Sequence, residues 1–177
     1  MMVRPPHRKE ETPAILSVTP VGDHRLLIAL GSGSFMDLNL RHCMYSNRYY
    51  NLNNPELFRG VFTDGYKIIF AEGDVFTPDI FPRQAINMAL RTLPTKPISF
   101  LRVQPMENSR IQLEMATESI LILNMEEHLR TGRYGDLPDD GMLPPVKADG
   151  ADLLIGDLRV GEDELTYLML STPTGEF

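Results

Sequence analysis

An internal repeat constrains the fold of this chain more than any other feature of its sequence. When residues 17–81 are placed over residues 102–166, at a constant offset of 85 and without a gap, thirteen positions are identical. The matches fall on apolar periodicity and on turn residues, which are the positions that a shared fold has to keep. Matched pairs include Ser34/Ser119, Leu38/Leu123, Asn39/Asn124, Tyr49/Tyr134, Val75/Val160 and the apolar exchange Ile80/Leu165. We therefore expect two homologous lobes of about 80 residues each.

Composition indicates an ordinary globular protein. The chain has 177 residues, of which 42% are hydrophobic and 23% charged, and it contains no apolar run long enough for a membrane span. Residues 1–13 are rich in charge and proline and lack the apolar centre of a secretory signal, so we expect a disordered arm there. A single cysteine, Cys43, excludes an internal disulfide. These features favour a cytoplasmic location without a membrane partner.

Charge is distributed unevenly between the two copies. Residues 1–98 hold 11 Lys and Arg against 9 Asp and Glu, whereas residues 99–177 hold 6 against 15, giving a chain total of −7. An acidic surface repels phosphate, so nucleic acid is an unlikely partner. Two interpretations stay open for the acidic second copy: a plain solvated surface, or a docking face for a basic partner.

The pattern of strands and turns predicts an α+β fold. Residues 14–21, 25–30 and 35–40 are short β-rich runs separated by turn residues, as in an antiparallel meander. Residues 55–58 suggest one helical turn, and a helix is expected over 79–93 or, because of a proline in that pattern, from Pro82. The second copy should end in a helix over 162–170. We assign 14–93 and 99–170 to the lobes, 94–98 to the linker and 171–177 to a tail.

Asp-Gly pairs predict one hairpin in each copy. Asp64-Gly65 and Asp149-Gly150 both lie between apolar runs, and Asp-Gly supplies the positive φ values of a two-residue turn. Each lobe is therefore expected to be an antiparallel meander plus a hairpin and a terminal helix, with the two lobes packed into one continuous body.

One segment of the first copy resembles a known bacterial family. Residues 54–65 read NPELFRGVFTDG and are followed by an apolar strand, by Glu72-Gly73-Asp74-Val75 and by Pro78-Asp79-Ile80-Phe81. This pattern resembles the small bacterial domain of unknown function 2442, although Asn54 stands where that family commonly has Asp. The resemblance covers residues 14–82, and residues 99–168 through the repeat only. It implies a small α+β domain of a regulatory or interaction system and brings no catalytic residues with it.

Residues that could carry catalysis or bind metal are scattered. His42 and Cys43 are adjacent, and the repeat places His128 opposite Cys43, but neighbours on an extended strand point to opposite faces. The four histidines lack zinc-binding spacing, and the Gly31–Ser34 segment lacks the Lys-Ser/Thr of a phosphate loop. We therefore expect no enzymatic activity, no metal and no cofactor.

The aromatic loop over residues 41–54 is the main candidate for a binding surface. Tyr45, Arg48, Tyr49 and Tyr50 combine large contact area with hydrogen-bonding tips, and asparagines surround them. Arg48-Tyr49 recurs as Arg133-Tyr134, and such a pair can be structural, with tyrosine packed under the loop, or part of a recognition surface. The candidate site residues are Tyr45, Arg48, Tyr49, Tyr50, Arg133 and Tyr134.

Two functions follow from different classes. The first is a non-catalytic interaction or regulatory protein that presents a groove or a sheet edge to another protein. The second is a small-ligand or nucleotide binder that uses the groove between the lobes. Because no convergent set of charged catalytic groups is present, we favour the interaction protein.

Overall fold

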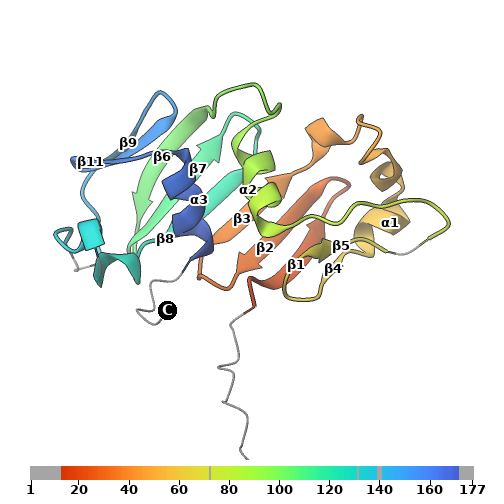
Figure 1. The fold of residues 1–177 in the computed structure, drawn as a ribbon, viewed down its shortest axis with the longest axis horizontal. Helices are drawn as coiled ribbons and strands as arrows, with labels where there is room; N and C mark the ends of the chain where they lie inside the picture. The colour runs from red at the N-terminus through yellow and green to blue at the C-terminus, as the bar shows by residue number, and fades with distance from the viewer. Residues whose placement is uncertain (1–12, 72, 131, 139–140, 172–177) are drawn as a thin grey trace, which may run out of the picture.

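A six-stranded antiparallel sheet forms the centre of the molecule (Figure 1). The computed structural model describes residues 13–71, 73–130, 132–138 and 141–171. We refer to residues 13–98 as the first half and to residues 99–171 as the second half. The predicted arm and tail lie almost entirely outside the described residues.

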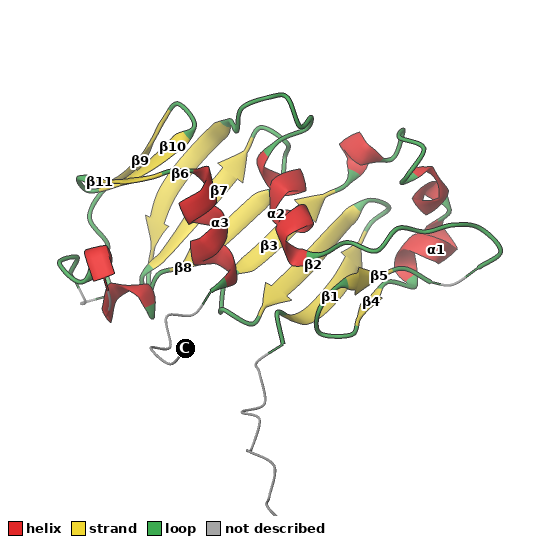
Figure 2. Cartoon of the chain, in the orientation of Figure 1, coloured by secondary structure: helices red, strands yellow, loops and turns green. Residues whose placement is uncertain are grey.

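The first half contains β1 (Ile15–Val21), β2 (Arg25–Leu30), β3 (Phe35–Asn39), η1 (Arg41–Cys43), η2 (Tyr50–Asn53), α1 (Pro55–Arg59), β4 (Phe62–Thr63), β5 (Ile68–Ile69) and α2 (Pro82–Leu90). The second half contains β6 (Phe100–Met106), β7 (Arg110–Met115), β8 (Ile120–Asn124), η3 (His128–Arg130), η4 (Gly132–Tyr134), β9 (Val146–Asp149), β10 (Asp152–Ile155), β11 (Leu158–Val160) and α3 (Glu162–Leu170). The expectation of a mixed α+β chain with mainly antiparallel sheets is confirmed (Figure 2).

Both halves build a three-stranded meander with the same strand lengths. The bounds of β6, β7 and β8 equal those of β1, β2 and β3 plus 85. Their turns match as well, since the amide of Leu30 donates to the Ser34 carbonyl at 3.0 Å and that of Met115 to the Ser119 carbonyl at 2.9 Å. Alternating burial along β2 and β7 explains the strands, because every second side chain enters the core.

The two meanders do not form separate sheets. Strand β3 pairs with β8, which gives the strand order β1-β2-β3-β8-β7-β6. Phe35 faces Ile122, Met36 faces Leu121, and Asp37 faces Ile120. Leu121 is the equivalent of Met36 at an offset of 85, so this position pairs with its own equivalent. Phe35 pairs with the equivalent of Asp37, and Asp37 pairs with the equivalent of Phe35. This reciprocity is that of a two-fold axis passing between Met36 and Leu121.

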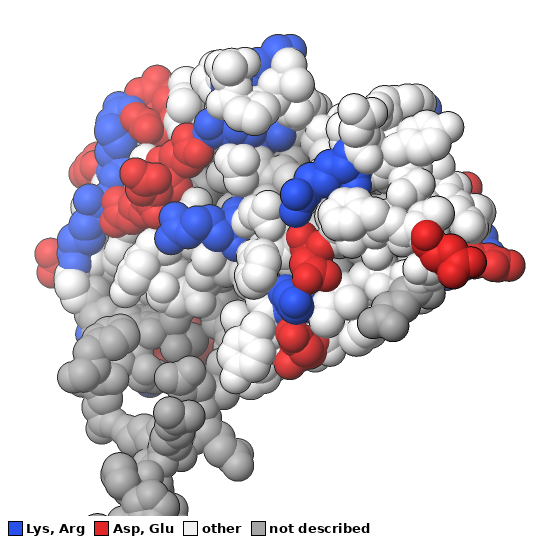
Figure 3. Space-filling view, turned by 45° about the vertical axis from the view of Figure 1, so that its right-hand side comes forward, with Lys and Arg blue, Asp and Glu red and all other residues white. Residues whose placement is uncertain are grey.

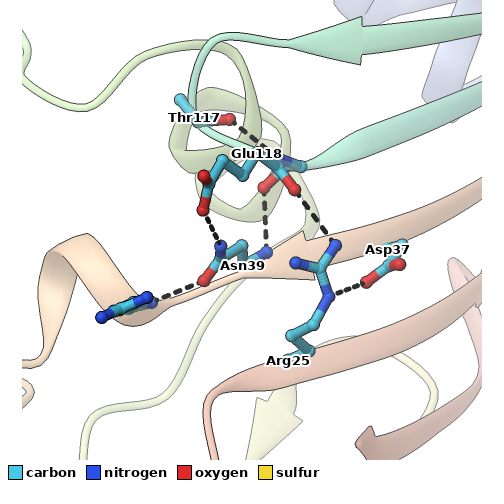
Figure 4. A network of polar contacts seen from close by, with 7 residues as sticks. Arg25, Asp37, Asn39, Thr117 and Glu118 are labelled. Atoms are coloured by element: carbon cyan, nitrogen blue, oxygen red, sulfur yellow. Dashed lines mark hydrogen bonds and ion pairs between the residues drawn. The ribbon is translucent and has the colours of Figure 1, made fainter.

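Buried side chains repeat the same reciprocity on both sides of the β3–β8 pair. The amide of Asn39 donates to Ser119 Oγ at 2.9 Å, and the amide of Asn124 donates to Ser34 Oγ at 3.0 Å. Figure 4 shows the first of these ends, where the Asn39 side chain also donates to the Glu118 carboxylate. These hydroxyls satisfy amides that would otherwise be buried without a partner.

Helices α2 and α3 lie side by side over one face of the sheet (Figure 1). Each helix is held by a turn of the other half: Ser32 donates its hydroxyl to the Met169 carbonyl of α3, and Thr117 donates to the Ala89 carbonyl of α2. A single hydrophobic cluster runs through both halves beneath the helices. The described residues therefore share one core rather than two.

The offset between equivalent residues of the two halves changes from 85 to 80 after residue 70 of the first half and residue 155 of the second. Helices α2 and α3 both have nine residues, but their first residues are 80 positions apart and not 85. Ile80 pairs with Ile68 in the first half, and Val160 pairs with Leu153 in the second half, so Val160 is the counterpart of Ile80. The matches Val75/Val160 and Ile80/Leu165 of the ungapped alignment are therefore wrong, because the first half carries five more residues before its helix. Helix α2 begins at Pro82 and not at residue 79.

The hairpins also differ from their predicted form. Thr63 pairs with Ile68, so the first loop has four residues, although Gly65 does adopt a positive φ of 97°. Asp149 pairs with Asp152, so Gly150 and Ala151 form the second turn in place of Asp149-Gly150.

The outer strands β1 and β6 share two irregularities. The register of β1 shifts between Ile15 and Ser17, and that of β6 shifts between Phe100 and Arg102. Each shift leaves one exposed leucine out of the pairing, Leu16 in β1 and Leu101 in β6. Each strand also contains a proline five residues after its start, Pro20 in β1 and Pro105 in β6. Such features are typical of sheet edges.

Candidate binding surface

Loop 41–54 is held in place by its own asparagines. The Asn53 side chain donates to the carbonyls of Met44 and Tyr50 at 2.8 and 2.9 Å, and Asn54 caps α1 by accepting from the Glu56 amide at 3.1 Å. Met44 and Leu52 anchor the loop in the core. Asn53 is thus used within the loop and Asn54 at the start of α1, although we expected both at a recognition surface.

This anchoring leaves two tyrosines facing solvent. Tyr45 is 83% exposed and Tyr50 is 63% exposed, while Arg48 is exposed beside them. Neither tyrosine hydroxyl takes part in a hydrogen bond within the described residues. Large aromatic side chains with free polar tips are suited to contact with a partner.

Tyr49 has a different environment from its two neighbours. It is half-buried, its ring lies under the Arg48 guanidinium at 5.9 Å, and its hydroxyl contacts Met88 Sδ of α2 at 3.7 Å. Tyr49 therefore joins the loop to α2 and presents little surface to a partner.

Arg133 and Tyr134 lie in the second half and are tied to α3. Tyr134 is buried, its hydroxyl donates to the Glu164 carboxylate, and Arg133 Nε lies 3.2 Å from the same carboxylate. Burial, followed by the bond to Glu164, raises the pKa of Tyr134. The structure does not bring this pair together with Tyr45 and Tyr50, and its contacts fit the structural alternative for the Arg-Tyr motif.

The segment around Phe76 belongs beside the loop, although the sequence analysis did not single it out. The Asn51 side chain donates to the Phe76 carbonyl at 2.7 Å, and Phe76 is 63% exposed. Its neighbour Val75 is exposed as well. An aromatic residue set among the turn residues Gly73, Asp74 and Pro78 was the available signal, because such a stretch cannot enter a strand interior.

Uncharged side chains cover much of the first half. Figure 3, in which the first half is turned toward the viewer, shows red and blue patches close together at the left of the view and larger uncharged areas, with smaller charged groups between them, toward the right. We call Tyr45, Arg48, Tyr50 and Phe76 the aromatic surface.

A cavity of about 370 Å³ adjoins the aromatic surface, between loop 41–54 and the C-terminal end of α2. His42, Cys43 and Tyr49 line it from the loop, and Met88 and Arg91 line it from the helix side. Burial raises the pKa of the Cys43 thiol to about 11, so the thiol is protonated at neutral pH and is a poor nucleophile.

His128, which the repeat places opposite Cys43, does not line the cavity beside Cys43. It is buried, and its Nε2 lies 3.1 Å from the Leu168 carbonyl of α3. Among the described residues, no group of three or more His, Cys, Asp or Glu side chains is arranged to hold a metal ion. Nor does any helix in this part of the chain have the length and apolarity to cross a bilayer.

Comparisons with known proteins give no further assignment. No protein-family model matches the chain, and neither a curated protein nor a solved structure was found to be similar to it.

Proposed function

We propose that the protein is a non-catalytic interaction protein that binds another protein through the aromatic surface. The observation that carries the proposal is the exposure of Tyr45, Tyr50 and Phe76, which no contact within the described chain requires. Aromatic residues and arginine are the side chains most often found at the energetic centre of protein interfaces.

The second half provides an internal control for this argument. At an offset of 85, Arg130 stands in place of Tyr45 and Gly135 in place of Tyr50. The same meander therefore folds without exposed aromatic residues at these positions. Folding of the meander therefore does not require Tyr45 and Tyr50, and a role in binding would explain why the first half has them.

We further propose that the two halves arose by duplication of one α+β unit. Equal strand bounds and the reciprocal Ser34–Asn124 and Ser119–Asn39 contacts support this origin. The resemblance of the first half to the domain of unknown function 2442 family is retained as part of the proposal. A cytoplasmic location is proposed on the basis of the single Cys43.

Affinity purification from a lysate of the native host, followed by mass spectrometry, tests the interaction. The wild-type chain is compared with Tyr50→Ser/Phe76→Ser, and the matched control is Leu101→Ser/Tyr167→Ser, which removes exposed apolar groups from the second half. We expect one protein to be captured by wild type and control but not by the first variant. Equal capture by all three would contradict the proposed surface.

Titration of the captured protein against the purified chain then gives the affinity. Each substitution at a central aromatic contact should weaken binding by at least about tenfold. A change of less than twofold for Tyr50→Ser and Phe76→Ser would place the interface elsewhere.

A further inference from the structure

The cavity beside α2 has the properties of a small-molecule site. Its volume of about 370 Å³ lies at the lower end of the roughly 300–1,000 Å³ that is typical of such sites. Its apolar wall is formed by Met88 of α2 together with Leu93 and Pro94, and Tyr49 faces it from the loop. The apolar part of a ligand would leave water on entering this space.

The charged groups of the cavity are of one sign. Arg48 and Arg91 line it, and no Asp or Glu is present among the described lining residues. Burial lowers the pKa of His42, which keeps that imidazole neutral at pH 7. In a chain of net charge −7, these arginines make the cavity favourable for an anion, mainly through Arg48, because Glu162 balances the charge of Arg91.

Arg91 has hydrogen-bonding capacity beyond its partner in the chain. Its side chain is 15% exposed and forms an ion pair with Glu162 of α3, while its buried Nε has no hydrogen-bond partner within the described residues. A guanidinium carries five donors, and one carboxylate cannot satisfy them all. Because Nε and Nη2 are both buried, a carboxylate in the cavity can contact Arg91 only at the part of the guanidinium that lines the cavity.

The end of α2 weakens the attraction for an anion. The cavity lies at the C-terminal end of this helix, where the helix dipole disfavours negative charge and opposes part of the attraction by the arginines. Because the wall is largely apolar, a single planar carboxylate on an apolar body fits this site better than a strongly hydrated phosphate. The cavity is also lined by three neutral residues with hydrogen-bonding groups, Ser46, Asn87 and Thr92.

We propose that this cavity binds a small amphipathic carboxylate, with its apolar body against Met88 and its carboxylate facing Arg48 and Arg91. The cavity shares Arg48 with the aromatic surface, but its test requires no protein partner.

Titration of the full-length chain with 3-phenylpropanoate, followed by ¹H–¹⁵N NMR, tests the proposal. The uncharged control is 3-phenylpropanamide, which has the same body and nearly the same shape. We expect saturable shifts of the amides of Ser46, Asn87 and Thr92, with the amide compound binding at least tenfold more weakly. Equal affinity for acid and amide, or shifts confined to other parts of the chain, would overturn the proposal.

Two variants separate a specific site from adsorption of the probe. Arg48→Gln changes an exposed side chain at the cavity and should weaken 3-phenylpropanoate binding about tenfold, whereas Arg83→Gln changes an exposed arginine of α2 outside the lining and should have no effect. Ser46→Trp places a large ring at the rim and should abolish binding while leaving the melting temperature unchanged. Loss of binding in Arg83→Gln equal to that in Arg48→Gln would contradict the assigned site.

Discussion

Residues 15–39 and 100–124 fold with the same strand bounds and turn hydrogen bonds, whereas the segments that follow them differ in path and exposure. After β3, loop 41–54 forms η1 and η2, leads into α1 and exposes Tyr45 and Tyr50. After β8, the corresponding segment forms η3 and η4 and buries Tyr134 against α3. Sheet formation constrains the first part of each half alike, while the second part is free to diverge. Surface features present in one half only are therefore the better candidates for function.

The largest expected effect concerns the shared core. Leu38 and Leu123 are identical, equivalent and fully buried. We expect Leu38→Ala and Leu123→Ala each to lower the free energy of unfolding by about 3 kcal/mol, because each leaves a cavity in one common core. Urea denaturation should show a single transition for both variants. Two separate transitions would mean that the halves unfold independently, and the exposed Leu101→Ala should change the stability by less than about 0.5 kcal/mol.

A smaller effect is expected at the junction of β3 and β8. Ser34→Ala and Ser119→Ala each remove a hydroxyl that accepts from a buried amide of the opposite half. Each should cost about 1–2 kcal/mol of unfolding free energy, since the amide is left without a partner. Chemical denaturation of the two variants should give costs within about 0.5 kcal/mol of each other. A much larger loss on one side only would show that the junction is less symmetric than its hydrogen bonds.

The two Arg-Tyr pairs should respond differently to loss of the tyrosine hydroxyl. Tyr134→Phe removes a donor to the Glu164 carboxylate, and we expect a loss of about 1 kcal/mol. Tyr49→Phe removes only a weak contact with the Met88 sulfur, so its unfolding free energy should stay within about 0.5 kcal/mol of wild type. Equal costs in thermal and urea unfolding would contradict the different roles that we assign to these residues.

The smallest effect is a pH dependence that arises mainly from the second half. Burial lowers the pKa of His128 below its ordinary value of 6.5, so the unfolded chain binds a proton more readily than the folded one. The contribution of His128 to stability is then complete above about pH 6.5 and is lost progressively as the pH falls below that value. The equivalent of His128 in the first half is Cys43, which does not titrate in this range of pH.

Urea denaturation between pH 5.5 and 8 measures this dependence, and His128→Gln should reduce its slope. Burial also lowers the pKa of His42, which contributes with the same sign, so His42→Gln/His128→Gln should be flatter still. A slope that is unchanged in the double variant would assign the dependence to other groups.

The strands of the sheet were predictable from sequence, because apolar alternation and turn residues report directly on which side chains enter the core. Residues 25–30 and 162–170 were predicted with the bounds that the structure has. The pairing of β3 with β8 was not predictable, since the apolar faces of Phe35–Asn39 and Ile120–Asn124 fit any neighbouring strand equally well. The five extra residues before α2 escaped detection because Val75/Val160 is a chance identity.

For the candidate site, composition indicated the right loop but not the role of each side chain. Tyr45 and Tyr50 lie at the surface, whereas Tyr49 and Tyr134 pack against helices, and a sequence without an alignment does not distinguish the two cases. Asn51 looked like a recognition group because its acceptor, the Phe76 carbonyl, comes from a distant part of the chain. Arg91 of the cavity was missed for the same reason, as its neighbours lie in loop 41–54.

The irregular outer strands β1 and β6 have a consequence for how this protein assembles. A sheet made by joining two meanders edge to edge has, in principle, two further edges at which another molecule could add a strand. An interrupted register and a proline, which has no N–H to donate, spoil the regular row of groups that such a strand needs. The same feature in both halves therefore disfavours the addition of a further strand at either outer edge. Strand β4 also packs against β1, and β9 packs against β6, which covers part of each edge.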